Sequence, residues 1–154
     1  MVLFDDRLRI NIPEDLHLAQ EHEAAEVFPH PKRPQLVFAN DDFSRFITFS
    51  LLNKPMGQQE AMSAAREMRT MVWSLYPNSI LSQAAPFSFG DLSCGSFTFR
   101  TGSKGAQVFN TMFVASFNGR MLLGTLGCGI DDLAGMKMLQ KLMVEAECLE
   151  DKDD

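Results

Sequence analysis

Cysteine is scarce in this sequence, and the few cysteines form no recognisable motif. Cys94, Cys128 and Cys148 are odd in number, lie far apart and include no Cys-x-x-Cys pair. Such a set does not build a disulfide framework or a zinc site, and it is typical of reduced thiols in the cytosol. We therefore expect a cytoplasmic protein without disulfides.

Long apolar runs are also missing. Charge already appears at Asp5, so the N-terminus lacks the basic and apolar regions of a signal peptide. No uninterrupted apolar run approaches the ~20 residues that a helix needs to cross a bilayer. The sequence predicts neither export nor a transmembrane segment.

Basic residues form no cluster. The 14 lysines and arginines are outnumbered by 20 acidic residues, and the net charge is −6. A chain of this charge repels a phosphate backbone, so nucleic acid is not an expected partner. With 154 residues, 45% of them hydrophobic, the chain can form one core. We expect one domain over residues 1–148, followed by an acidic, frayed tail over residues 149–154.

Motifs for catalysis and metal binding are absent from the sequence. His17, His22 and His30 invite a metal hypothesis, but the first two do not share a helix face and no cysteine accompanies them, so we expect surface histidines. The glycine-rich turn at 102–105 precedes a predicted strand, whereas a phosphate-binding loop precedes a helix. No Gly-x-Ser-x-Gly nucleophile motif occurs. We predict no catalytic residue, no metal and no cofactor, and we do not expect an enzyme.

The chain does contain several short apolar segments, many of them alternating with polar residues, which is typical of strands. Asn40, Asp41 and Asp42 favour a turn between two of these segments and predict a hairpin there. The predicted strands are Arg7–Ile12, Gln35–Ala39, Arg45–Leu52, Ile80–Gln83, Asp91–Arg100, Gln107–Phe117 and Arg120–Cys128.

The last two strands flank Asn118-Gly119, the pair of residues that favours a two-residue type I′ turn. Such a turn fixes the register, so Phe117 is expected opposite Arg120 and Phe113 opposite Gly124. One face of this hairpin then carries Phe109, Phe113, Phe117, Leu122 and Leu126, and is predicted to be core. The other face is mixed, but it is too apolar to be left to water.

Two segments have the period of an amphipathic helix. In the first, Gly57–Tyr76, the apolar stripe is formed by Ala61, Ala65, Met68, Val72 and Leu75. The second extends over Asp131–Glu147, with Asp131 as the expected N-cap. Two helices and an antiparallel sheet of about six or seven strands give an α+β protein, with one helix for each face of the sheet.

Two groups of residues form the candidate partner surface. The helical group shares a flank beside the core stripe, where Arg69 can stack on Trp73, and such residues are enriched at binding hot spots. Packing of this flank on a neighbouring loop is the alternative explanation. The hairpin group lies on the mixed face, where flexible methionines suit a binding surface or fill the core. The members are Met62, Arg66, Arg69 and Trp73 on the helix, and Met112, Val114, Met121 and Leu123 on the hairpin.

The order of these elements resembles the PsbP-like family, which includes a photosystem II extrinsic protein, a eukaryotic Ran-binding protein and many bacterial proteins. The resembling pieces are the opening strand to Pro13, the stretch 28–31, the strand through Phe46–Leu51, the motif Phe97-Thr-Phe99 and the hairpin ending at Cys128. The resemblance implies a three-layer α/β/α sandwich around a central antiparallel sheet. It also implies action through binding rather than catalysis. A bacterial branch of similar fold supplies chaperones for secretion effectors.

Three hypotheses for the function follow. The first is a non-catalytic protein-binding module or chaperone-like adaptor. Its mixed hairpin face also predicts self-association as a homodimer. The second is a carrier that holds a small apolar ligand or lipid between the sheet and a helix. The third is an enzyme of a type without a recognisable motif, which a polar cleft would support.

Overall fold

The structure is a computed structural model that describes residues 2–4, 7–20, 34–102 and 107–148. The elements are β1 (Val2–Leu3), β2 (Leu8–Arg9), β3 (His17–Leu18), β4 (Leu36–Ala39), β5 (Arg45–Pro55), the 3-10 helix η1 (Gln58–Glu60), α2 (Ala61–Leu75), β6 (Ala85–Phe89), β7 (Leu92–Thr101), β8 (Val108–Phe117), β9 (Arg120–Gly129), α3 (Leu133–Val144) and β10 (Glu147–Cys148).

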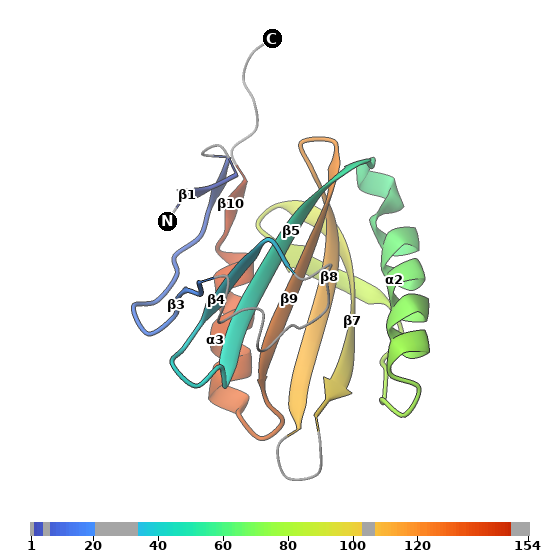
Figure 1. The fold of residues 1–154 in the computed structure, drawn as a ribbon. Coiled ribbons are helices and arrows are strands. Elements are labelled where there is room, and N and C mark those ends of the chain that lie inside the picture. Colours follow the sequence, from blue (N-terminus) through green and yellow to red (C-terminus); the bar gives the residue numbers. More distant parts are fainter. Residues whose placement is uncertain (1, 5–6, 21–33, 103–106, 149–154) are drawn as a thin grey trace.

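The centre of the fold is a seven-stranded sheet with the order β3-β4-β5-β9-β8-β7-β6, in which every neighbouring pair is antiparallel. Helix α2 packs on one face, against β7 and β8, and α3 packs on the other face, against β9 and β6 (Figure 1). A second sheet of three strands, β1-β2-β10, joins the beginning of the chain to the segment after α3. The predicted three-layer α/β/α sandwich is confirmed.

The β8–β9 hairpin has the predicted register. Phe117 pairs with Arg120 and Phe113 with Gly124. Asn118 and Gly119 adopt φ angles of 50° and 76°, the left-handed values that a type I′ turn requires. The turn residues therefore decide which side chains of both strands face α3.

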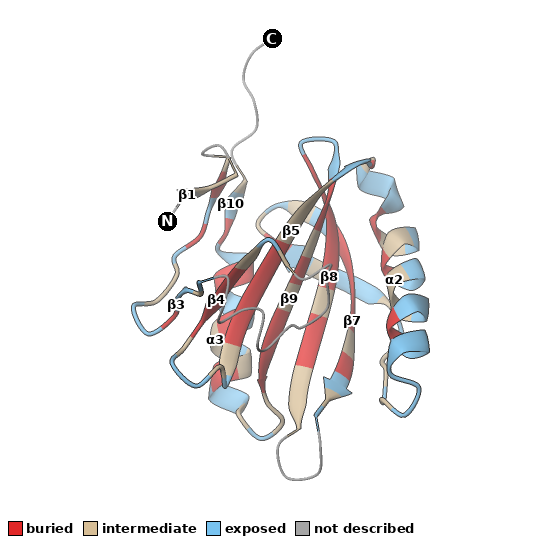
Figure 2. Ribbon diagram, in the orientation of Figure 1, coloured by how far each residue is buried: buried red, intermediate tan, exposed pale blue. Residues whose placement is uncertain are grey.

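The core beneath α3 is aromatic. The rings of Phe87 and Phe113 stack with their centroids 4.9 Å apart, and Phe89 lies 5.1 Å from Phe113. The Phe113 ring covers Gly124 on the adjacent strand, where a Cβ would overlap it. Figure 2 shows the buried residues along β5, β9, β8 and β7, while the outer face of α2 is exposed. The predicted core face is thus filled, although Phe109 is only half-buried.

Some strand predictions were wrong in extent. Of the predicted strand Arg7–Ile12, the strand β2 contains only Leu8–Arg9, and its partners β1 and β10 are two residues long as well. The predicted strand Ile80–Gln83 is reduced to a single bridge between Leu81 and Phe99. The strand of this region is instead Ala85–Phe89, which the sequence did not suggest because it contains Pro86. Proline is tolerated there since β6 is at the edge of the sheet.

The helices also depart from prediction at their ends. Leu75 was expected in the core stripe but is 59% exposed, and the ring of Tyr76 stacks on Phe99 instead, at 6.3 Å. Helix α3 ends at Val144 rather than at the predicted Glu147, and Glu147–Cys148 form the strand β10. The predicted tail 149–154 and the turn 103–105 lie outside the described residues. In the described ranges, no helix is long and apolar enough to cross a membrane.

The cap of α3 is Asp132, not the predicted Asp131. Its carboxylate accepts a hydrogen bond of 3.0 Å from the backbone N–H of Gly135. It also forms a two-pronged ion pair with Arg45 on β5, where Nε lies 2.7 Å from Oδ2 and the second guanidinium nitrogen lies 2.9 Å from Oδ1. The hydrogen bonds from Arg45, and then that from Gly135, hold the pKa of Asp132 below its ordinary value. One carboxylate therefore both caps the helix and ties it to the sheet.

We expect Asp132→Ala to lower the free energy of unfolding by about 2 kcal/mol, since it removes a helix cap and a charged hydrogen-bonded pair. Asp131→Ala, at the neighbouring exposed position, is the control and should change it by less than about 0.5 kcal/mol. Urea denaturation at neutral pH measures both. Equal losses in the two variants would contradict the assignment of the cap.

The same pair gives a stability that depends on pH. The folded pKa of Asp132 is depressed, so its contribution is complete above the unfolded pKa of about 4 and is lost as the pH falls through the folded value. Denaturation of the wild type should show the free energy of unfolding falling between neutral and acidic pH. In the Asp132→Ala variant this fall should be smaller, because the contribution of Asp132 is absent at every pH.

Candidate functional site

The helical group of predicted partner residues, Met62, Arg66, Arg69 and Trp73, lies on α2. Trp73 is 58% exposed and Arg66 is exposed, whereas Met62 and Arg69 are half-buried. The Nε of Arg69 donates a hydrogen bond of 2.6 Å to the carbonyl oxygen of Ser82. Arg69 thus packs on the following loop, as the alternative explanation held, and Trp73 and Arg66 remain as surface residues.

The hairpin group divides into core and partly covered residues. Val114 and Met121 are 0% and 4% exposed, so their assignment to a partner surface was wrong. Helix α2 covers them through Ala61 and Ala65. Close approach is possible because Gly95 lies beneath the helix, where a Cβ would be 2.8 Å from the carbonyl oxygen of Ala61.

Met112 and Leu123, the other two members of the hairpin group, are half-buried. Leu123 packs against the cluster beneath the start of α2, and Met112 packs with Val72 and two phenylalanines of β7. Helix α2 therefore covers most of the mixed hairpin face.

Many of the exposed apolar side chains belong to the C-terminal end of α2 and the segment that follows it, on more than one side of the helix. Of the eight large hydrophobic residues exposed in the described ranges, five lie within the ten positions 71–80. We call these five residues the 71–80 patch: Met71 (48% exposed), Trp73 (58%), Leu75 (59%), Tyr76 (48%) and Ile80 (67%). Of these five residues, only Trp73 was predicted to lie on a partner surface. The sequence feature that could have revealed the other four is Pro77, which ends the helix. Apolar residues on both sides of a helix end cannot all belong to one buried helical stripe.

Two serines fasten the segment after α2 to the edge of β7. Ser79 Oγ donates a hydrogen bond of 2.6 Å to the carbonyl oxygen of Arg100 and accepts one of 3.1 Å from the N–H of Arg100. The backbone of Ser82 donates to the carbonyl oxygen of Thr98, and its Oγ accepts from the N–H of Thr98 at 2.8 Å. Ile80 is therefore presented to solvent by a segment that is anchored on both sides.

A hollow of about 340 Å³ lies at this end of α2, and we call it the α2-end hollow. Its apolar walls include Leu75, Tyr76 and Ile80 from the patch. Among the described residues that line it, Arg100 is the one charged residue and none is a carboxylate. No ion pair links the exposed Arg66 or Arg100 to a carboxylate within the part of the chain that the structure describes.

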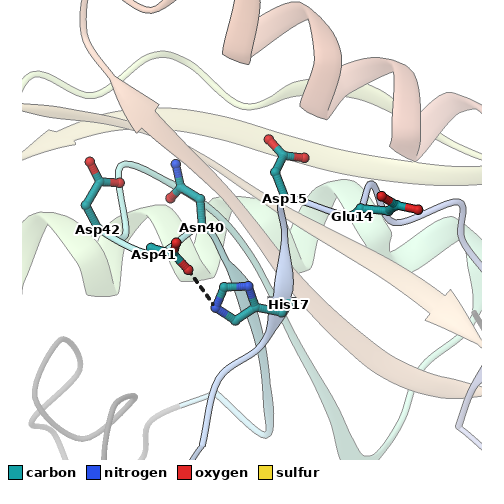
Figure 3. Close-up of a pocket in the computed structure, with 6 residues that line it drawn as sticks. All are labelled: Glu14, Asp15, His17, Asn40, Asp41 and Asp42. Carbon is teal, nitrogen blue, oxygen red and sulfur yellow. Dashed lines mark ion pairs between the residues drawn. The ribbon is translucent and has the colours of Figure 1, made fainter.

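A second hollow, of about 480 Å³, lies at the opposite edge of the sheet, beside β3 and the β4–β5 turn. Nε2 of His17 lies 3.4 Å from Oδ1 of Asp41 there, and the other carboxylates do not converge on this pair (Figure 3). Among the described residues no His, Cys, Asp or Glu side chains are grouped to hold a metal ion, and His22 and His30 lie outside them. The residues that line this hollow are Glu14, Asp15, His17, Asn40, Asp41 and Asp42.

Comparison with solved structures identifies the fold. Cyanobacterial PsbP (CyanoP) from Synechocystis sp. PCC 6803 superposes with a TM-score of 0.65 at 11% identity, over 96% of this chain and 90% of that one. The Ran-binding protein Mog1p of Saccharomyces cerevisiae superposes with a TM-score of 0.61 at 9% identity, over 97% of this chain and 94% of that one. The chain has the PsbP-like fold.

A protein of Bacteroides thetaiotaomicron VPI-5482 superposes with a TM-score of 0.67 at 10% identity, over 99% of this chain and 49% of that one, so this chain spans about half its length. No protein-family model and no curated protein sequence matches the chain. Identities this low establish the PsbP-like fold alone, because unrelated functions are hosted on shared folds.

Two of the three cysteines of this PsbP-like fold, Cys94 and Cys128, are poor nucleophiles. Burial, with a smaller effect of the nearby Cys148, raises the pKa of the Cys94 thiol to about 12. Burial, and then the charge of Asp132, also raises the pKa of Cys128. Because the thiolate is the reactive form, neither thiol is prepared for catalysis.

We expect Cys94 and Cys128 to resist alkylation at mildly alkaline pH in the folded protein and to react once urea unfolds it, whereas the half-buried Cys148 should react first. Mass spectrometry of the labelled chain counts the modified thiols. Labelling of Cys94 in the folded protein as fast as in the unfolded chain would contradict this.

The free energy of unfolding should also fall as the pH rises above about 9, because the Cys94 thiol ionises there in the unfolded chain but not when it is buried in the folded protein.

Proposed function

We propose that this protein is a non-catalytic binding module, an adaptor or a chaperone-like protein, that takes a protein partner at the C-terminal end of α2. The observation that carries the proposal is the 71–80 patch. Large apolar side chains scattered singly on a surface need no explanation, but a local concentration of them marks an interaction site. Tryptophan and tyrosine are also the side chains that contribute most at protein interfaces.

The fold supports this proposal. Mog1p is a Ran-binding protein of the same fold, so a binding role has a precedent among proteins built in this way. The Ran partner itself is not proposed for this chain. Among the described lining residues, neither hollow combines a serine or cysteine nucleophile with a histidine base, the pair that an acyl-transfer enzyme needs.

Packing favours a protein partner over a small apolar ligand. A carrier holds its ligand in an enclosed apolar cavity. In the described residues the space under α3 is filled by stacked phenylalanines such as Phe87 and Phe113, and the space under α2 is closed by the approach of Ala61 and Ala65 to Gly95. The two hollows lie at the surface, and each has polar or charged residues in its lining.

Partner capture from cell extract should depend on the 71–80 patch. We expect a Trp73→Ser, Ile80→Ser double variant to lose the specific partner that the wild type retains, because it removes two exposed apolar contacts. Both side chains are more than half exposed, so the stability of the variant should stay within about 1 kcal/mol of the wild type. Quantitative mass spectrometry of the captured proteins is the measurement.

The matched control is Leu133→Ser with Val144→Ser, which removes two side chains of similar exposure, 71% and 56%, from α3. This control should capture the same partner as the wild type. If all three proteins captured the same set, the partner surface would not be at the end of α2.

The predicted homodimer is a separate expectation. It now depends on Met112 and Leu123, because α2 covers Val114 and Met121, the other members of the hairpin group. Sedimentation velocity at micromolar concentration tests it directly. A dimer that a Leu123→Ser variant dissociates would support the hairpin face as the interface, and a monomeric wild type would exclude self-association there.

A further inference from the structure

The charges of this chain are unevenly distributed. Of the 20 acidic residues, only Asp91 lies between positions 68 and 130, whereas four basic residues lie there: Arg69, Arg100, Lys104 and Arg120. This stretch therefore carries a formal charge of +3 within a chain of net charge −6. It contains the last part of α2, the 71–80 patch and the strands β6 to β9. The 71–80 patch thus lies in a stretch of sequence that is cationic within an acidic chain.

The two hollows reflect this division. Four carboxylate residues line the hollow beside β3, whereas Arg100 is the one charged residue among the described residues that line the α2-end hollow. An arginine without a carboxylate partner in the described structure, beside exposed leucine, tyrosine and isoleucine side chains, suits a ligand that is apolar and negatively charged at once. Arginine recognises carboxylates through paired hydrogen bonds, and complementary charge also speeds the encounter.

The walls of the hollow are held in place before any ligand arrives. Ser79 fixes the backbone of Arg100, and the Tyr76 ring rests on Phe99. The N–H of Ser79 donates to the carbonyl oxygen of Tyr76, which closes the turn that presents Ile80. A preformed surface loses less conformational entropy on binding, so contacts made here convert more fully into affinity.

We propose that the α2-end hollow binds a segment of a partner protein in which apolar side chains alternate with carboxylates, with Leu75, Tyr76 and Ile80 contacting the apolar side chains and Arg100 a carboxylate. The inference rests on the proposed function and adds the chemistry of the partner to it. Nucleic acid also carries negative charge, but it binds proteins through many phosphate contacts. The described lining offers its phosphates a single arginine, and the chain as a whole is acidic, so a protein segment fits better.

The test is titration calorimetry with a short synthetic peptide in which Glu and Asp alternate with Leu and Phe. Trp73 is the only tryptophan in the chain, is 58% exposed and comes two residues before Leu75, so a change in its fluorescence would report peptide binding at this end of α2. We expect binding that weakens with added salt. Arg100→Gln should weaken it about tenfold, because it removes a charged hydrogen bond. Ile80→Ser should weaken it by a similar factor.

Matched controls separate charge from apolar contact. Lys137→Gln removes an exposed cation from α3 and should leave the affinity for the peptide unchanged. A peptide with Lys in place of the acids, and one with Ser in place of Leu and Phe, should both bind at least tenfold more weakly. Equal binding of the lysine peptide, an affinity unaffected by Arg100→Gln, or tighter binding of a single-stranded oligonucleotide at the same site would each overturn the inference.

The outcome is distinguishable from failure of the proposed function. If partner capture depends on the 71–80 patch but the acidic peptide does not bind, the binding module stands and the partner chemistry is wrong. If the Trp73→Ser, Ile80→Ser variant captures the same proteins as the wild type, the proposed function fails as well.

Discussion

The register of the β8–β9 hairpin is the constraint on which the rest of the structure depends. Asn118 and Gly119 supply two positive φ angles, and the short turn leaves one register for the strands on either side. That register places Phe113 over Gly124 on the side of α3, and Val114 and Met121 on the side of α2. A slip of one residue would exchange the two faces, and neither helix would find its apolar partner.

Helix α2 depends on a close approach that small residues allow. Ala61 and Ala65 pack over Gly95, so the first half of the helix lies directly on β7 and β8. Further along, Val72 and Tyr76 contact Phe97 and Phe99. Leu75 and Trp73 project from other sides of the helix and stay exposed. The packing that buries the beginning of α2 therefore leaves an apolar surface at its end.

Anchoring of the chain after α2 gives this surface its functional interest. An exposed apolar segment in a loosely held loop would be free to fold onto the protein. Here Ser79 and Ser82 bond the segment to the backbone of β7 from both sides of Ile80. Acidic residues are also almost absent from positions 68–130 of the sequence. The proposed binding specificity rests on these two features together.

The sequence by itself determined the fold class, the hairpin and its register, and the existence of both helices, because each depends on local periodicity or on a turn that few residues can make. Tertiary structure decided the rest. Asp132 rather than Asp131 caps α3 because Arg45, far away in sequence, lies where it can pair with it. Val114 and Met121 are core and Leu75 is surface because α2 crosses the sheet at one particular place. Periodicity gives the faces of a helix, but which part of a face is covered depends on where the helix meets the sheet.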